Sequence, residues 1–162
     1  MADKDIATYL NDHLAGSIAA LELLEHLEAA HAGSDVGQLA AGLRVDVATD
    51  RQELEKLMSR LHVAESRTRK VMAWLTEKGT EIKLRLEDPS GGELRLLEAL
   101  EALSLGIEGK RSLWRALAAA AQDAPALQGT DYEHLAQRAE EQRRRVEAAR
   151  LEAARQALIP GS

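Results

Sequence analysis

The chain has 162 residues, a formal net charge of −6 and no cysteine. The missing cysteine excludes disulfides, thiolate metal sites and a cysteine nucleophile, and the negative charge disfavours nucleic acid, whose phosphates require a cationic surface. Alanine, leucine, glutamate and arginine dominate while aromatic residues make up only 2%, which favours packed helices over a β-sheet. The composition therefore predicts one all-α domain, residues 1–162.

Two helices are predicted in the first part of the chain. The first covers residues 3–31 and is closed by Gly33. The second covers residues 35–63 and begins after Ser34, a residue type that caps helix N-termini; from Leu39 to Leu61 its apolar residues recur at steps of three and four. Because the connection between them is short, we expect an antiparallel hairpin.

The next stretch, residues 64–89, is long enough to cross the length of a bundle. Val71, Met72 and Leu75 give it an apolar face at helical spacing, and Gly79 then ends the pattern. We therefore expect a short additional helix at about residues 65–78 that packs against the bundle.

A second hairpin is predicted from helices at about residues 91–121 and 131–158. Ser90 with Glu93, and Thr130 with Glu133, have the spacing of capping boxes, in which two helix-start N–H groups are satisfied reciprocally. Two hairpins joined by one long crossover form the up-down-down-up connectivity of ferritin-like four-helix bundles.

Two segments resemble a known family: YLNDHLAGSIAALELLEHL at residues 9–27 and LEALEALSLGIEGKRSLWRAL at residues 97–117. Over nearly its whole length the chain is similar to uncharacterised bacterial proteins of the ferritin-like four-helix-bundle superfamily. Both segments are packing patterns rather than reaction signatures, so the resemblance implies the fold more than a function.

The ligand pattern of di-iron members of that superfamily is missing. They use a Glu from each of two helices and a Glu-x-x-His pair from each of the other two, all at mid-bundle. Here Glu-x-x-His occurs once, from Glu28 to His31, in the last turn of its helix; the nearest second match runs from Asp131 to His134, at a helix start. We therefore expect neither a metal nor another cofactor.

A buried ionic network is predicted in place of the metal. Asp50 and Arg143 both lie within a few residues of their helix midpoints, so their pairing is the first contact expected, and Arg111 and His13 are the other candidates. A buried arginine requires an acid or a bound anion, and arginine opposes a divalent cation. The alternative for Arg143 is a side chain that extends along the apolar stripe and ends in water.

Helix 91–121 carries a second apolar face, which includes Gly106, Gly109 and Leu113. A glycine inside a helix costs about 1 kcal/mol relative to alanine, so two of them suggest the close approach of another backbone. The candidates are the crossover helix and a second copy of the chain, which would make the protein a homodimer. An unidentified protein partner is the remaining possibility.

Signatures of catalysis are absent from the sequence: it contains no phosphate-binding loop, no His-Glu-x-x-His and no nucleophile elbow. We expect a cytoplasmic, non-enzymatic structural or protein-interaction module, because neither an apolar signal segment nor a run of 18 apolar residues is present. Two alternatives remain open. One is a metal-binding bundle with an atypical ligand set drawn from Glu28, His31, Glu93, His13 and Asp50; the other is anion binding at Arg111 and Arg143.

Overall fold

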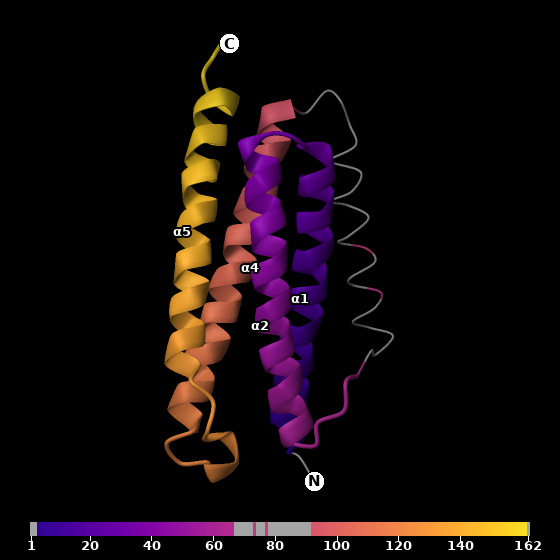
Figure 1. Cartoon of the computed structure of the whole chain (residues 1–162), viewed down its shortest axis with the longest axis vertical. Helices are drawn as coiled ribbons and strands as arrows, with labels where there is room; N and C mark the ends of the chain where they lie inside the picture. The colour runs from indigo at the N-terminus through magenta and orange to yellow at the C-terminus, as the bar shows by residue number, and fades with distance from the viewer. Residues whose placement is uncertain (1–2, 67–72, 74–76, 78–91, 162) are drawn as a thin grey trace.

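The computed structural model describes residues 3–66, 73, 77 and 92–161. These residues form four long helices, α1 (Lys4–Ala30), α2 (Asp35–Arg60), α4 (Gly92–Ala120) and α5 (Tyr132–Ala157), and one short 3-10 helix, η1 (Pro125–Leu127). The result is an all-helical bundle, with no strand in the described part of the chain (Figure 1). The predicted all-α class is confirmed, and each long helix lies within three residues of its predicted bounds.

The predicted crossover helix at residues 65–78 falls almost wholly outside the described residues. Of the described residues in this range, Glu65 and Ser66 are not helical, whereas Ala73 and Glu77 are. Glu65 and Ser66 belong to a short stretch without regular secondary structure that is fixed to α1 through Asn11. The Asn11 side chain donates to the Ala64 carbonyl at 3.1 Å and accepts from the Ser66 N–H at 2.7 Å.

The helix starts follow from side-chain capping. Ser34 caps α2 as predicted, with its hydroxyl accepting from the Gly37 N–H at 3.2 Å. At α5 the predicted cap, Thr130, is wrong, because Asp131 fills that role and accepts from the His134 N–H at 3.0 Å. A carboxylate adds favourable charge at the positive end of the helix dipole, which a threonine hydroxyl does not.

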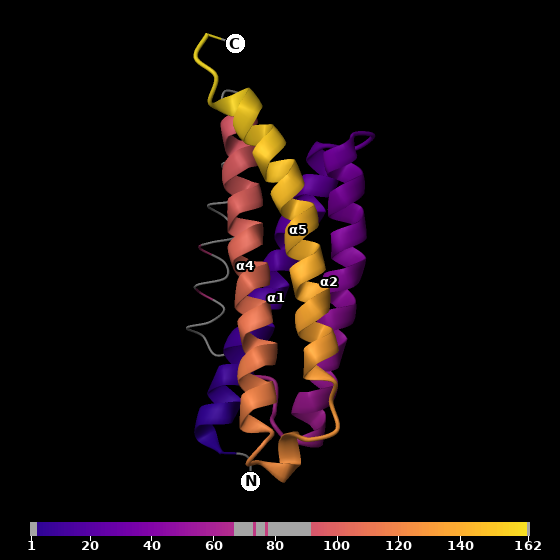
Figure 2. The same cartoon turned by 90° about the vertical axis from the view of Figure 1, so that its left-hand side faces the viewer.

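The helices are arranged as two hairpins that face each other. α1 packs closely along α2, and α4 packs closely along α5, whereas contacts between the hairpins, α1 with α4 and α2 with α5, are sparser. Figure 2 shows α4 and α5 side by side with α2 next to α5. This arrangement leaves more room between the hairpins than within them.

The buried apolar residues form two separate clusters, one in each half of the bundle. The first is built around Leu24, Leu43, Leu100 and Val146, and the second around Leu10, Met58, Trp114 and Tyr132. Each helix therefore buries one stripe and presents its polar face outward. None of the described helices has both the length and the apolarity needed to cross a bilayer.

Substitution of Gly106 by alanine is expected to stabilise the protein. No atom of the described residues lies within 4 Å of the position that a Cβ would take at Gly106 or at Gly109. The exchange should therefore raise the free energy of unfolding by about 0.5–1 kcal/mol through helix propensity alone, as measured by urea denaturation. A loss of stability would instead mean that another backbone packs on this face.

Gly37→Ala is the contrasting control on α2. A Cβ at Gly37 would lie 2.2 Å from the backbone oxygen of His31, which cannot move as the end of a flexible side chain can. We expect this exchange to lower the free energy of unfolding by about 1–3 kcal/mol.

Candidate functional site

A layer of polar residues separates the two apolar clusters near the middle of the bundle. On α4, Lys110 follows the buried Ile107 by three residues and precedes the buried Trp114 by four, so it occupies a core position in the helical stripe. The other helices show the same interruption of their buried stripes. The residues that interrupt the four stripes are Ser17, Asp50, Lys110 and Gln142.

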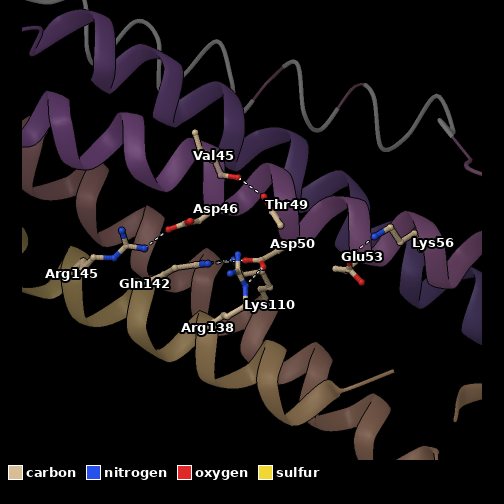
Figure 3. Close-up of polar contacts among 10 residues, drawn as sticks. All are labelled: Val45, Asp46, Thr49, Asp50, Glu53, Lys56, Lys110, Arg138, Gln142 and Arg145. Carbon is tan, nitrogen blue, oxygen red and sulfur yellow. Dashed lines mark hydrogen bonds and ion pairs between the residues drawn. The ribbon is translucent and has the colours of Figure 1, made fainter. Parts of the chain in front are cut away.

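Asp50 is the centre of this layer and is only 1% exposed. One carboxylate oxygen accepts from Lys110 Nζ at 2.6 Å and from Gln142 Nε2 at 2.8 Å. The other oxygen accepts from Arg138 Nε at 2.8 Å, and Lys110 also donates to Gln142 Oε1 (Figure 3). We call Asp50, Lys110, Arg138 and Gln142 the mid-bundle layer; it joins α2 to both helices of the other hairpin.

The charges within the mid-bundle layer are unequally compensated. Burial raises the pKa of Asp50, but Lys110 and the hydrogen bonds from Gln142 and Arg138 outweigh it, so the pKa of Asp50 is lowered. Burial has the largest effect on Lys110 and, together with the nearby Arg138, lowers its pKa although Asp50 and Asp46 act in the opposite direction. The Asp50 carboxylate thus contacts two cations, whereas Lys110 and Arg138 have that one carboxylate as their shared contact.

Arg111 and Arg143 lie outside the mid-bundle layer, so the predicted pairing of Asp50 with Arg143 is wrong. Arg111 contacts Glu108 at 2.9 Å, and Arg143 contacts Glu140 at 3.1 Å. These four residues form a partly exposed group between α4 and α5, with Arg111 also 3.6 Å from Glu140. Each arginine follows a core position by one residue, and one residue turns the side chain by about 100° around the helix axis.

Ser17 lies in the α1 stripe but does not join the mid-bundle layer. Its hydroxyl donates to the Leu14 carbonyl of its own helix at 2.6 Å. α1 therefore contributes a satisfied polar group to this level of the bundle, and no charge.

His13, the remaining predicted member of the network, is half-buried and makes no ion pair with any described residue. Its ring packs edge-on against Tyr9, with the two centroids 4.7 Å apart. Burial lowers the pKa of His13, and the nearby Asp12 carboxylate offsets this only in part. The histidine is thus held in its neutral form more strongly than a histidine in water.

His13 should make stability fall in mild acid. Because its pKa is lower in the folded than in the unfolded chain, where the reference value is 6.5, the unfolded state binds more protons below that pH. The His13 contribution is therefore fully present above pH 6.5 and is lost as pH falls through the lower folded value. Urea denaturation at about pH 7 and about pH 5 measures the decrease.

His13→Gln should reduce this decrease, and His134→Gln, on the exposed side of α5, is the control that should leave it unchanged. An equal pH response in wild type and His13→Gln would show that another group carries the effect.

The three residues of the predicted second packing face line one cavity, which lies between α1, α2 and α4. Leu113 is 1% exposed and also belongs to the core cluster with Trp114, whereas Gly106 and Gly109 are not buried. The partner expected to pack on these glycines stays a prediction.

The residues of the alternative metal site do not converge. Glu28 is held by Arg44, which contacts its two oxygens at 2.7 Å and 3.3 Å, and Glu93 is exposed in the first turn of α4. Over residues 3–66, 73, 77 and 92–161, no three His, Asp or Glu side chains gather into a group that could hold a metal ion.

Comparisons with family models, curated proteins and solved structures find no match to this chain. What the site can do is therefore argued from the mid-bundle layer itself. A carboxylate that is 1% exposed, with both oxygens accepting from side chains of the opposite hairpin, serves to join helices.

Proposed function

We propose that the chain is a cytoplasmic, non-enzymatic bundle of the ferritin-like type that acts as a structural or protein-interaction module. The mid-bundle layer takes the level at which a redox bundle holds its metal. The observation that supports this most strongly is the saturation of Asp50, the one acid at 1% exposure in the described chain, by Lys110, Arg138 and Gln142.

The proposed connectivity is up-down-down-up. In Figure 1, α2 ends at the end of the bundle where the N-terminus lies, whereas α4 begins at the opposite end. A long connection of this kind between two hairpins is the ferritin-like arrangement. The resemblance of residues 9–27 and 97–117 to that superfamily supports the same proposal.

Metal loading tests the central claim. The purified protein is incubated with Mn²⁺ or Fe²⁺ under anaerobic conditions, desalted and subjected to elemental analysis. We expect far less than one ion per chain, and the same result for Asp50→Asn. Near-stoichiometric metal in the wild type that is lost in Asp50→Asn would replace this proposal with the metal-binding alternative.

We propose further that the module is a homodimer formed through α4. Leu105 is 74% exposed on α4, and a large exposed apolar side chain is a candidate contact between two copies of the chain. Light scattering on the full chain should give twice the mass of one chain. Leu105→Glu should halve that mass, while the control Val45→Glu on α2, another exposed apolar site at 62%, should not; a monomeric wild type would contradict the proposal.

A further inference from the structure

The cavity beside the mid-bundle layer has the size of a small organic molecule. Its volume is about 220 Å³, and it lies between α1, α2 and α4. Gly16, Gly106 and Gly109 border it, and none of them has an atom of the described residues within 4 Å of a would-be Cβ. An apolar cavity of about 150 Å³ accepts benzene, whereas pockets for drug-sized ligands begin near about 300 Å³.

Two residues of the cavity wall have an N–H group with no acceptor among the described residues. Trp114 is 1% exposed, and its indole Nε1 has no partner among the described residues. Lys110 has three N–H groups, of which Asp50 and Gln142 accept two. Both residues border the cavity, and since they are four apart on α4 they lie on the same side of the helix.

The electrostatics at this wall favour a negative ligand. Among the described residues, Asp50 is the only acid in contact with Lys110 and Arg138, which leaves two cations for one contacting acid, while Asp46 acts on both from farther away. Of the other charged groups at the cavity, Arg51 is paired with Glu55 at 2.8 Å and Asp12 is exposed to water. A surplus buried cation is stabilised by an anion that can accept its remaining hydrogen bond.

The rest of the wall is suited to an apolar body. Ile107 and Leu113 are both at least 97% buried and line the cavity together with Leu54. A ligand with a charged head alone would leave this surface without contacts.

We propose that the cavity binds a small monocarboxylate with a compact apolar body, of the size of benzoate or phenylacetate. The carboxylate accepts from Lys110 Nζ, and the ring or short chain lies against Ile107 and Leu113 in the space left by the glycines. This site goes beyond the proposed structural role and does not depend on it.

Thermal unfolding and titration calorimetry of the full chain with benzoate test the proposal. Benzoate should raise the melting temperature increasingly with concentration. Benzamide, which has the same shape without the charge, and acetate at the same ionic strength, which has the charge without the ring, should raise it far less. If benzamide stabilises the protein as well as benzoate, or if benzoate has no effect and the cavity holds water alone, the proposal is wrong.

Two variants locate the binding site. Gly109→Leu fills the cavity and should abolish benzoate binding, while Ala116→Leu, which adds the same side chain on the exposed side of α4 outside the cavity, should leave it intact. Circular dichroism confirms folding of each variant; benzoate binding that survives in Gly109→Leu would overturn the assignment.

Discussion

Replacement of Asp50 by alanine is expected to lower the free energy of unfolding by about 3–5 kcal/mol, the usual effect of removing one partner from a buried ion pair. The substitution leaves Lys110 and Arg138 close together inside the bundle with no carboxylate between them, and only 15% of the Lys110 side chain is exposed. It also removes the acceptor of the Gln142 amide. Urea denaturation near neutral pH, followed by far-UV circular dichroism, measures the loss.

Asp46→Ala is the matched control for that experiment. Asp46 lies one turn before Asp50 on α2 and pairs with Arg145, but both side chains of this pair are about one-third exposed. We expect a loss of no more than about 1 kcal/mol, because water compensates exposed charges when a partner is removed. Equal losses in Asp46→Ala and Asp50→Ala would show that the mid-bundle layer has no special weight in stability.

Lys110→Met should destabilise the protein by about 2–4 kcal/mol, whereas Arg111→Met should change its stability by no more than about 1 kcal/mol. The two residues are neighbours on α4 and both are cationic. Without Lys110, Asp50 loses its closest cation and Gln142 Oε1 loses its donor. Without Arg111, Glu108 and Glu140 keep water and Arg143 as partners.

Methionine has a similar length to lysine and arginine and a good helix propensity. Lys110→Met and Arg111→Met therefore differ mainly in which residues lose contact with a positive charge. Denaturation curves of both variants at one pH provide the measurement. If Arg111→Met were the more harmful exchange, the assignment of Lys110 to the core stripe would be incorrect.

The bounds of the four long helices can be predicted from the sequence to within three residues. Apolar residues recur at three and four residue steps in each segment, and local chemistry marks the ends, as at Ser34 and Gly33. The buried position of Asp50 follows from the same spacing, since Asp50 is three residues after Val47 and four before Leu54. These features depend only on neighbours within one helix.

The partners of Asp50 are harder to predict. α4 has apolar residues on two sides, so its stripe can pass through Arg111 or through Lys110. Lys110 is selected only when steps of four and three alternate strictly over the longer run of buried residues Leu103, Ile107, Trp114 and Leu117. Arg138 carries no such signal. Its contact with Asp50 depends on the relative height of α2 and α5, which no local pattern of residues encodes.

The mid-bundle layer also determines how far one hairpin can slide along the other. Leucine and alanine side chains accept many neighbours, so a displacement by one helical turn, about 5.4 Å, would exchange one set of apolar contacts for a similar one. The same displacement would move Asp50 away from its cations on the opposite hairpin and leave a bare charge in an apolar environment, at a cost of several kcal/mol. We therefore expect Asp50 to fix the axial position of one hairpin relative to the other, which the apolar contacts alone would leave undetermined.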